Sequence, residues 1–343
     1  MKKLIIWWGK SDNNYSRNQL IRKLLFNLGY QIINFIPLIS SLGHIEANFR
    51  LNCKPNLIWV PCFRHRDMIS ASIWARKNNI PLIFDPLISS WDKQINERKK
   101  FTVNSYKSKK IKNYETKIFN MADVLIADTH NHKQFFHKNF NVPLNNINVL
   151  LVGADQAIFK PLKKTSYIKN EVLFYGSDLE LHGISTIIKA AKITKDKSIK
   201  WVLIGNFKRY KDINNIIIEK SIPYKNLPNR ISKSKILLGI FSGSEKAGNV
   251  IPNKVFQSMA CGKPIITRKS NSYPKNILNT KNGVFFIDPE KPEQLSKSVT
   301  NLIYNEKKIL DAGKLSRKFF MRYFSEKIIE KQLKEILNKV NIN

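Results

Sequence analysis

The segment from Phe241 to Thr267 reads FSGSEKAGNVIPNKVFQSMACGKPIIT and carries the clearest structural signals in the chain. An apolar run ends at Phe241, and a loop of small residues follows it. Pro252 is typical of the first turn of a helix, and Gly262 is typical of the left-handed residue that ends one. Pro264 then begins a second apolar run. The segment therefore predicts a strand, a short helix that begins at the carboxyl end of that strand, and another strand.

Two lysines flank the start of this predicted helix. Lys246 precedes the helix and Lys254 lies in its first turn. Free backbone N–H groups and the helix dipole favour an anion at that end, and two ammonium groups add positive charge. We therefore expect a diphosphate group to bind there. The alternative is a connecting helix with two solvated lysines.

Short apolar runs alternate with amphipathic stretches along nearly the whole chain, which is typical of βα units and parallel sheets. Strands are expected over residues 4–8, 31–36, 57–60, 81–84, 124–127, 149–152, 172–175, 201–204, 236–241, 264–267 and 284–287. Helices are expected, for example, over residues 17–28, 68–77, 184–193 and 294–304. The pattern predicts an α/β fold.

A length of 343 residues favours two domains over one. Residues 161–169 are polar, contain a proline and lack periodicity, so we expect them to link the domains. The first domain is then expected over residues 1–160 and the second over residues 170–322. A C-terminal helix over residues 323–343 is expected to pack back on the first domain.

The chain is strongly basic, with 59 Lys and Arg against 25 Asp and Glu and a formal net charge of +34. Such a surface favours polyanions, which include nucleic acid, an anionic membrane face and phosphorylated small molecules. A solvated basic surface without a partner is the alternative. Basic residues are concentrated at Arg98-Lys99-Lys100, Lys107-Ser108-Lys109-Lys110 and Lys112, with apolar residues nearby. This cluster predicts peripheral association of the first domain with an anionic membrane.

The sequence predicts a cytoplasmic protein. The apolar run from Leu4 to Trp8 is too short for an export signal, and no later run has membrane-spanning length. The three cysteines are scattered and lack the paired spacing of a zinc site or a disulfide framework. No Asp-x-Asp motif is present, so we expect no bound metal.

Two motifs within the segment from Phe241 to Thr267 resemble the donor-binding region of the glycosyltransferase family 4 group. They are Pro252-Asn253-Lys254 and Met259-Ala260-Cys261-Gly262-Lys263-Pro264. Further similar stretches follow the family's order at residues 122–128, 152–161, 172–184 and 202–205. The resemblance implies the GT-B fold, in which two Rossmann-like domains face each other across a cleft. It also implies an acceptor-side first domain and a second domain that binds a nucleotide sugar.

The activity that the resemblance implies is sugar transfer from a nucleotide-diphosphate donor. The transfer is expected to retain the configuration of the sugar and to need no obligatory metal or other cofactor. The acceptor is expected to be a saccharide or a polyprenyl-linked molecule, in cell-surface polysaccharide biosynthesis. Alternatives remain open: a nucleotide-sugar epimerase-like protein or a catalytically lapsed protein of the same fold. A basic nucleic-acid-binding protein is a further alternative, although no recognised binding module supports it.

The sequence departs from the family where relatives hold the donor. Gln257 and Asn249 stand where many relatives have a pair of Glu residues, one of which holds the ribose. Ser177 and His182 stand where an Arg and a Lys often grip the diphosphate. We therefore expect Lys246 and Lys254 to hold the diphosphate and Gln257 to touch the ribose. The expected donor-binding residues are Gly9, Gly176, His182, Gly205, Ser244, Glu245, Lys246, Asn249, Pro252, Asn253, Lys254 and Gln257.

Candidate catalytic residues follow the fourth strand, where relatives frequently have a His. Asp85 and Asp92 stand there, and either one is a candidate for contacting the acceptor hydroxyl. Ordinary turn chemistry at Asp85-Pro86 is the alternative. His130 and His132 follow the next strand and are expected on a loop or helix surface.

Overall fold

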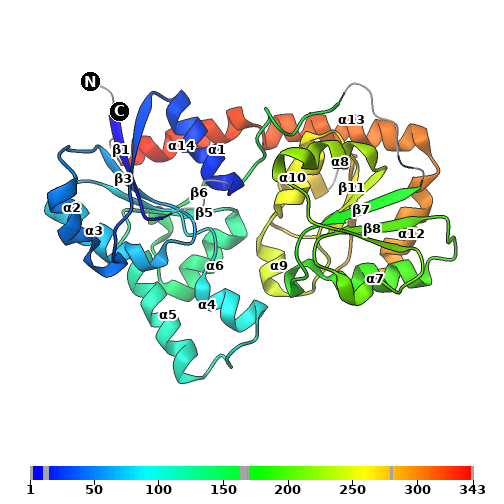
Figure 1. Cartoon of the computed structure of the whole chain (residues 1–343), viewed down its shortest axis with the longest axis horizontal. Helices are drawn as coiled ribbons and strands as arrows, with labels where there is room; N and C mark the ends of the chain where they lie inside the picture. Colours follow the sequence, from blue (N-terminus) through cyan, green and yellow to red (C-terminus); the bar gives the residue numbers. More distant parts are fainter. Residues whose placement is uncertain (1–2, 11–14, 163–167, 169, 279–280, 341–343) are drawn as a thin grey trace. The chain divides into compact units, whose positions relative to one another are not determined.

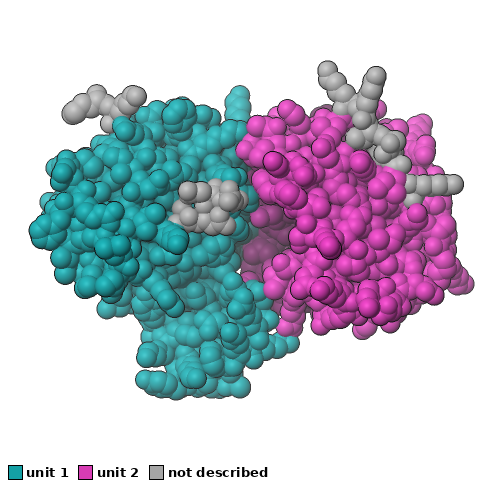
Figure 2. Space-filling model, in the orientation of Figure 1, with its two compact units in different colours: residues 1–152, 326–343 teal, residues 153–325 magenta. Residues whose placement is uncertain are grey.

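Two six-stranded parallel sheets organise the chain and confirm the predicted α/β class (Figure 1). The computed structural model describes residues 3–10, 15–162, 168, 170–278 and 281–340. The chain divides into unit 1, residues 1–152 with 326–343, and unit 2, residues 153–325 (Figure 2). Of the expected linker, residues 163–167 and 169 lie outside the described residues, as do residues 11 and 12 of the turn after the first strand.

The sheet of unit 1 has the strand order β2-β1-β3-β4-β5-β6. Its strands are β1 (Lys3–Trp8), β2 (Tyr30–Phe35), β3 (Leu57–Val60), β4 (Leu82–Phe84), β5 (Val124–Ala127) and β6 (Ile147–Val149). β1 is an inner strand, and its side chains alternate between two cores: Ile5 and Trp7 join one, Ile6 and Trp8 the other. β6 shares only Val149 with the strand expected over 149–152, because Asn148 interrupts the apolar run and yet lies within the ladder, opposite Ile126.

Helices cover both faces of this sheet (Figure 1). They are α1 (Ser16–Asn27), α2 (Gly43–Arg50), α3 (Met68–Lys77), α4 (Ser90–Asp92), α5 (Tyr106–Phe119), α6 (His130–Phe140) and α14 (Glu326–Lys339). Single turns η1 (Ser40–Leu42), η2 (His65–Asp67) and η4 (Leu144–Asn146) and the π-helical turn η3 (Lys93–Glu97) connect them. α1 and α14 pack on the face of Ile5 and Trp7, whereas α2, α3, α5 and α6 contribute to the other core.

The sheet of unit 2 has the order β12-β11-β10-β7-β8-β9. Its strands are β7 (Glu171–Tyr175), β8 (Lys200–Ile204), β9 (Ile216–Glu219), β10 (Ile236–Leu238), β11 (Ile265–Arg268) and β12 (Val284–Ile287). β9 was not predicted from the sequence; it is a four-residue strand at the sheet edge in which only Ile216 is buried. The strand expected over 236–241 ends at Leu238, where Gly239 packs its backbone against the side chain of Thr267.

The helices of unit 2 are α7 (Ile184–Ile193), α8 (Leu227–Lys233), α9 (Glu245–Asn249), α10 (Asn253–Ala260), α11 (Lys275–Leu278), α12 (Pro292–Ile303) and α13 (Glu306–Tyr323). Its single turns are η5 (Glu180–His182), η6 (Lys208–Tyr210) and η7 (Tyr224–Asn226). The chain runs outward from β7 to β9 and then returns to β10 on the other side of β7. Ligands of such sheets bind outside the carboxyl strand ends at this reversal.

Candidate functional site

Glycines at the ends of two neighbouring strands leave space at the reversal in unit 2. Gly176 follows β7 with φ +149°, and Gly205 follows β8 with φ +145°. A Cβ on Gly205 would lie 2.2 Å from the carbonyl oxygen of Gly176, so a side chain is excluded there. A Cβ on Gly176 would lie 3.5 Å from Nζ of Lys254 and 3.2 Å from Cε1 of His182. Two nitrogen-bearing side chains therefore border the end of β7.

Lys254 lies in the first turn of α10, as the sequence predicts, and only 5% of it is exposed. Its ammonium lies 4.4 Å from the centre of the Phe174 ring, a cation–π contact. Among the described residues, no carboxylate pairs with this ammonium and no acceptor receives a hydrogen bond from it. Burial lowers the pKa of Lys254 to about 7. An anion beside Gly176 would supply the missing partner.

Neither lysine is solvated, which contradicts the alternative of a connecting helix with two solvated lysines. Lys246 is 6% exposed, and it belongs to a separate helix, α9, which the sequence analysis did not predict. Ser244 caps α9 by accepting a hydrogen bond from the backbone N–H of Ala247 at 3.3 Å. Lys246 and Ala247, in the first turn of α9, are both buried. Glu245, in the first turn of the same helix, is exposed.

His182 is a neutral imidazole beside Lys254. Desolvation, together with the Lys254 charge, lowers the pKa of His182 to about 3. Its Nδ1 lies 2.6 Å from the carbonyl oxygen of Ser177, which can only accept, so Nδ1 carries the proton. The backbone N–H of Phe241 donates to the His182 carbonyl at 3.0 Å. This bond brings the turn after β7 against the segment that follows β10.

The loop between β10 and α9 is braced by residues outside the predicted site. Arg268 donates through Nη1 to the carbonyl oxygens of Ser242 at 2.5 Å and Ser244 at 3.1 Å. The N–H of Gly243 donates to Oε1 of Glu290 at 3.0 Å. No motif in the sequence marks Arg268 or Glu290, because each reaches the loop from a different strand end.

Gln257 is 5% exposed and faces the carboxyl end of β7. The Tyr175 hydroxyl donates to Oε1 of Gln257 at 3.0 Å, which orients the amide. Pro252 is the N-cap residue of α10, and Asn249 and Asn253 lie beside it, all three half-buried. The structure thus gathers the predicted donor-binding residues of unit 2 around two helix starts and two strand ends.

Gly9 belongs to unit 1, where it follows β1 with φ +110°. A Cβ on Gly9 would lie 2.7 Å from Oδ2 of Asp67 and 2.9 Å from Nε of Arg64. These two side chains form an ion pair with an N–O distance of 2.5 Å. Gly9 therefore lets a charged pair approach the end of β1.

Asp85 follows β4, is 1% exposed and forms a 2.7 Å ion pair with Nε of Arg17. Arg17 also donates to the carbonyl oxygen of Leu150 at 3.0 Å. Burial raises the pKa of the Asp85 carboxyl, and the Arg17 charge opposes that shift. Within the described residues, Oδ1 of Asp85 and Nη2 of Arg17 have no hydrogen-bond partner. Asp92 lies in α4, is 4% exposed and accepts from Asn96 at 2.8 Å.

His132 is buried, contrary to the expectation of a surface position, whereas His130 is exposed. The Nδ1 atom of His132 lies 2.6 Å from Oδ1 of Asp128, and the His132 ring centre lies 4.2 Å from that of Phe136. Thr129 caps α6 by accepting from the His132 N–H at 3.0 Å. The four-residue spacing between Asp128, just before α6, and His132, in the first turn of α6, is the sequence signal that could have predicted this pair.

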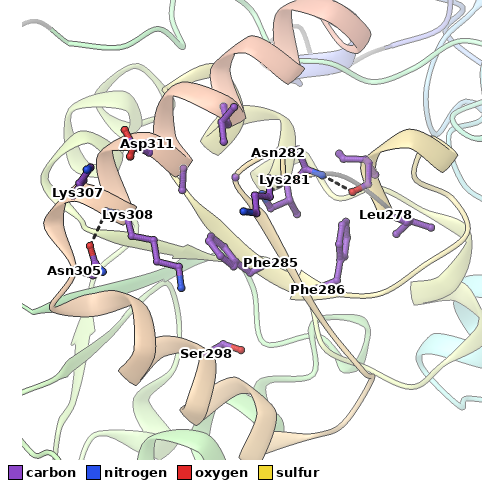
Figure 3. A pocket seen from close by; sticks show the side chains of 15 residues that line it. Leu278, Lys281, Asn282, Phe285, Phe286, Ser298, Asn305, Lys307, Lys308 and Asp311 are labelled. Carbon is purple, nitrogen blue, oxygen red and sulfur yellow. Dashed lines mark hydrogen bonds between the residues drawn. The ribbon is translucent and has the colours of Figure 1, made fainter.

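A groove of about 850 Å³ lies elsewhere in unit 2, beside β12 and the start of α13 (Figure 3). Phe285, Phe286 and Lys308 line it, and so do Leu278 and Lys281. Residues 279 and 280, between the last two, lie outside the described residues. The groove shares no lining residue with the site around Lys254.

Within the described part of the chain, no three His, Cys, Asp or Glu side chains are grouped as metal ligands.

No helix of the described residues combines the length and apolar character that crossing a membrane requires.

Residues 146–319, about half of the chain, match the family described as glycosyl transferases group 1. The chain belongs to this family. Two uncharacterized glycosyltransferases of Methanocaldococcus jannaschii are similar to it. One is 26% identical over 165 residues, 46% of this chain and 45% of that protein. The other is 24% identical over 241 residues, 65% of this chain and 60% of that protein. The chain thus spans about half to three fifths of the length of these curated relatives.

Solved structures show the fold of this family member. HepE of Anabaena in complex with UDP matches with a TM-score of 0.70 at 13% identity, over 98% of this chain and 100% of that one. Sucrose-phosphate synthase of Thermosynechococcus elongatus matches with a TM-score of 0.75 at 13% identity, over 98% of this chain and 99% of that one. A glycosyltransferase of Rickettsia africae matches with a TM-score of 0.73 at 13% identity, over 100% of this chain and 99% of that one. These likenesses confirm the two-domain GT-B fold predicted from the sequence.

Proposed function

We propose that this chain is a glycosyltransferase that takes its sugar from a nucleoside-diphosphate sugar. The observation that carries the proposal is Lys254, an ammonium that is buried without an acidic partner at the N-terminus of α10. Burying an unpaired charge costs free energy, and a diphosphate beside Gly176 would repay that cost. The structurally similar HepE was crystallised with UDP and with UDP-glucose, which supports a uridine nucleotide as the first ligand to test.

In this proposal the departing diphosphate is stabilised by positive charge already in place. Negative charge develops on the diphosphate as the bond to the sugar breaks, and oriented N–H groups and an ammonium lower the energy of that state. Lys254 and the first turn of α10 supply both. His182, being neutral, can contact the diphosphate without adding charge, and Gln257 is proposed to bind the ribose. Lys246, in α9, is proposed to hold the diphosphate together with Lys254.

We further propose membership of the family 4 group, retention of configuration and transfer without an obligatory metal, on the motifs at Pro252–Lys254 and Met259–Pro264. The acceptor is proposed to be a saccharide or a lipid-linked saccharide in cell-surface polysaccharide biosynthesis. Asp85 is the candidate contact for its hydroxyl, because Oδ1 of this buried carboxylate has no partner among the described residues. A cytoplasmic location at the inner face of a membrane accords with the basic surface of unit 1.

A screen of nucleotide sugars tests the proposal. The protein is heated with UDP-, GDP-, ADP-, dTDP- and CMP-sugars, and the melting temperature is compared with that in the presence of each base or monophosphate alone. One nucleoside-diphosphate sugar is expected to raise the melting temperature most. The same compound is expected to release its nucleoside diphosphate when saccharide acceptors are added. Conversion of the sugar without any acceptor would instead indicate an epimerase, and no shift with any diphosphate would contradict the proposal.

A further inference from the structure

The most basic segment of unit 1 is residues 98–112, here called the basic tip. It contains seven basic residues and no acidic one, namely Arg98, Lys99, Lys100, Lys107, Lys109, Lys110 and Lys112. The segment includes the turn after η3 and the first half of α5, which extends away from the sheet of unit 1 (Figure 1). A large positive charge is therefore concentrated at one place on unit 1.

The basic tip also exposes apolar side chains. Val103 is 56% exposed and Tyr106 is 79% exposed, and both lie between the two runs of basic residues. All seven basic residues except Lys112 are exposed as well. Lys112 is half-buried, with its ammonium 4.8 Å from the centre of the Trp91 ring. Cations that surround protruding apolar groups suit a surface that is anionic outside and apolar beneath.

Buried contacts hold the base of the tip in place. Glu115, in α5, accepts hydrogen bonds from the backbone N–H of Ser90 at 2.5 Å and of Trp91 at 3.0 Å. The indole of Trp91 donates to Ser108 at 2.9 Å, within the tip itself. Ser105 caps α5 by accepting from the N–H of Ser108 at 3.2 Å. The charged and apolar groups are thus presented by an ordered helical hairpin.

We propose that the basic tip docks on an anionic lipid bilayer. Lys and Arg interact with the headgroups, and Val103 and Tyr106 enter the interfacial layer, where amphipathic aromatic rings are favoured. Nucleic acid fits the tip less well, because strand binding relies on several exposed rings that stack with bases. Here the Phe101 ring is half-buried and lies 5.3 Å from the Lys107 ammonium, which leaves Tyr106 as the well-exposed ring of the tip.

A second apolar surface on unit 1 provides a matched comparison. Leu42, the residue before α2, and Ile45 and Phe49 within it follow a spacing of three and four residues and are 47%, 48% and 79% exposed. The one basic residue of the last turn of α2, Arg50, is paired with Glu46. This face lacks the cation cluster of the tip, so charge complementarity assigns the bilayer to the tip.

Co-sedimentation with vesicles tests the inference independently of donor binding. The full chain is mixed with vesicles of phosphatidylcholine alone or with one third phosphatidylglycerol. In the tip variant, Gln replaces Lys99, Lys100, Lys109 and Lys110. In the control variant, Gln replaces four lysines that are exposed in unit 2, namely Lys189, Lys192, Lys195 and Lys200. Each cation near an anionic surface strengthens binding roughly fivefold, so the tip variant should bind phosphatidylglycerol vesicles at least about a hundredfold more weakly.

The control variant has the same net charge and should bind as the parent does. Val103→Ser with Tyr106→Ser should weaken binding roughly tenfold, whereas Leu42→Ser with Phe49→Ser should leave it unchanged. Equal losses in the tip and control variants, or a loss on changing α2, would overturn the proposal. So would stronger binding of the parent to a single-stranded oligonucleotide than to the vesicles. The UDP-induced shift in melting temperature should be the same in all variants, which separates this inference from the proposed function.

Discussion

The ammonium of Lys254 lies 4.4 Å from the centre of the Phe174 ring, at the carboxyl end of β7. The ring face attracts the cation but does not replace a counter-ion, since burial still lowers the lysine pKa to about 7. A buried, unpaired ammonium of this kind lowers the unfolding free energy of the protein without a ligand, and it raises the unfolding free energy when an anion is bound. The first and the last of the predictions follow from this contact.

Replacing Lys254 with Met should raise the melting temperature at pH 6. The amine has its ordinary pKa of 10.5 in the unfolded chain and a pKa of about 7 in the folded one. Between these values the unfolded state binds more protons, so the unfolding free energy of the parent rises with pH across that window. Lys254→Met removes the slope. The variant should be more stable by a few kcal/mol, on the order of 2–4, below pH 7 and equal to the parent near pH 10.

Urea unfolding of both proteins between pH 6 and pH 10 measures this difference. Lys189→Met, at an exposed position of α7, is the control and should match the parent throughout. A variant that is less stable than the parent at pH 6 would show that the Lys254 ammonium has a partner in the folded protein.

Gln257→Glu should tighten the binding of the donor. A carboxylate in this position accepts a charge-assisted hydrogen bond from a ribose hydroxyl and keeps the bond from Tyr175. The affinity for UDP should rise by roughly tenfold, as one stronger hydrogen bond gives. Calorimetric titration measures it, and loss of binding would mean that the site is built around the neutral amide.

Gly205→Ala should destabilise unit 2 and abolish UDP binding. The new Cβ would lie 2.2 Å from the carbonyl oxygen of Gly176, so β7 and β8 would separate at the site. Gly29→Ala is the matched control, because Gly29 also has a positive φ of +85° but no atom within 4 Å of a Cβ. Backbone strain alone costs about 1–2 kcal/mol, and overpacking adds about 1–3 kcal/mol. Equal losses in the two variants would refute the close approach of the strands.

Asp85→Asn should be strongly destabilising because it leaves the Arg17 guanidinium buried without its partner. Breaking a buried ion pair costs about 3–5 kcal/mol, whereas replacing both partners with apolar residues is often nearly neutral. Chemical denaturation of Asp85→Asn and of Arg17→Met with Asp85→Leu compares the two cases. A double variant as unstable as the single one would show that the pair stabilises unit 1 through more than mutual neutralisation.

Local signals in the sequence were sufficient for most elements. Pro252 and Gly262 stand at the two ends of α10, and Gly262 has the left-handed φ of +68° that the sequence predicts. The strands that are buried on both faces are long apolar runs and were found to within a few residues. β9 was missed because three Ile residues at a sheet edge form too short a run among Asn and Lys.

The environment of the candidate site could not be predicted in the same way. Burial of Lys254 depends on Phe174, which lies 80 positions away in the sequence, and burial of Lys246 depends on the unpredicted helix α9. The contacts of Arg268 and Glu290 with the loop at 242–244 likewise join separate strand ends. Such pairs come together only through the sheet topology, which no local pattern records.

The most direct test of the account is the calorimetric affinity for UDP of the parent, Lys254→Met and Lys189→Met at pH 6.5, with circular dichroism to confirm folding. Losing one charge-assisted contact should weaken UDP binding by roughly ten- to a hundredfold in Lys254→Met, while Lys189→Met binds as the parent does. A folded Lys254→Met protein that binds UDP with the parent's affinity would contradict the claim that this buried ammonium holds the donor diphosphate.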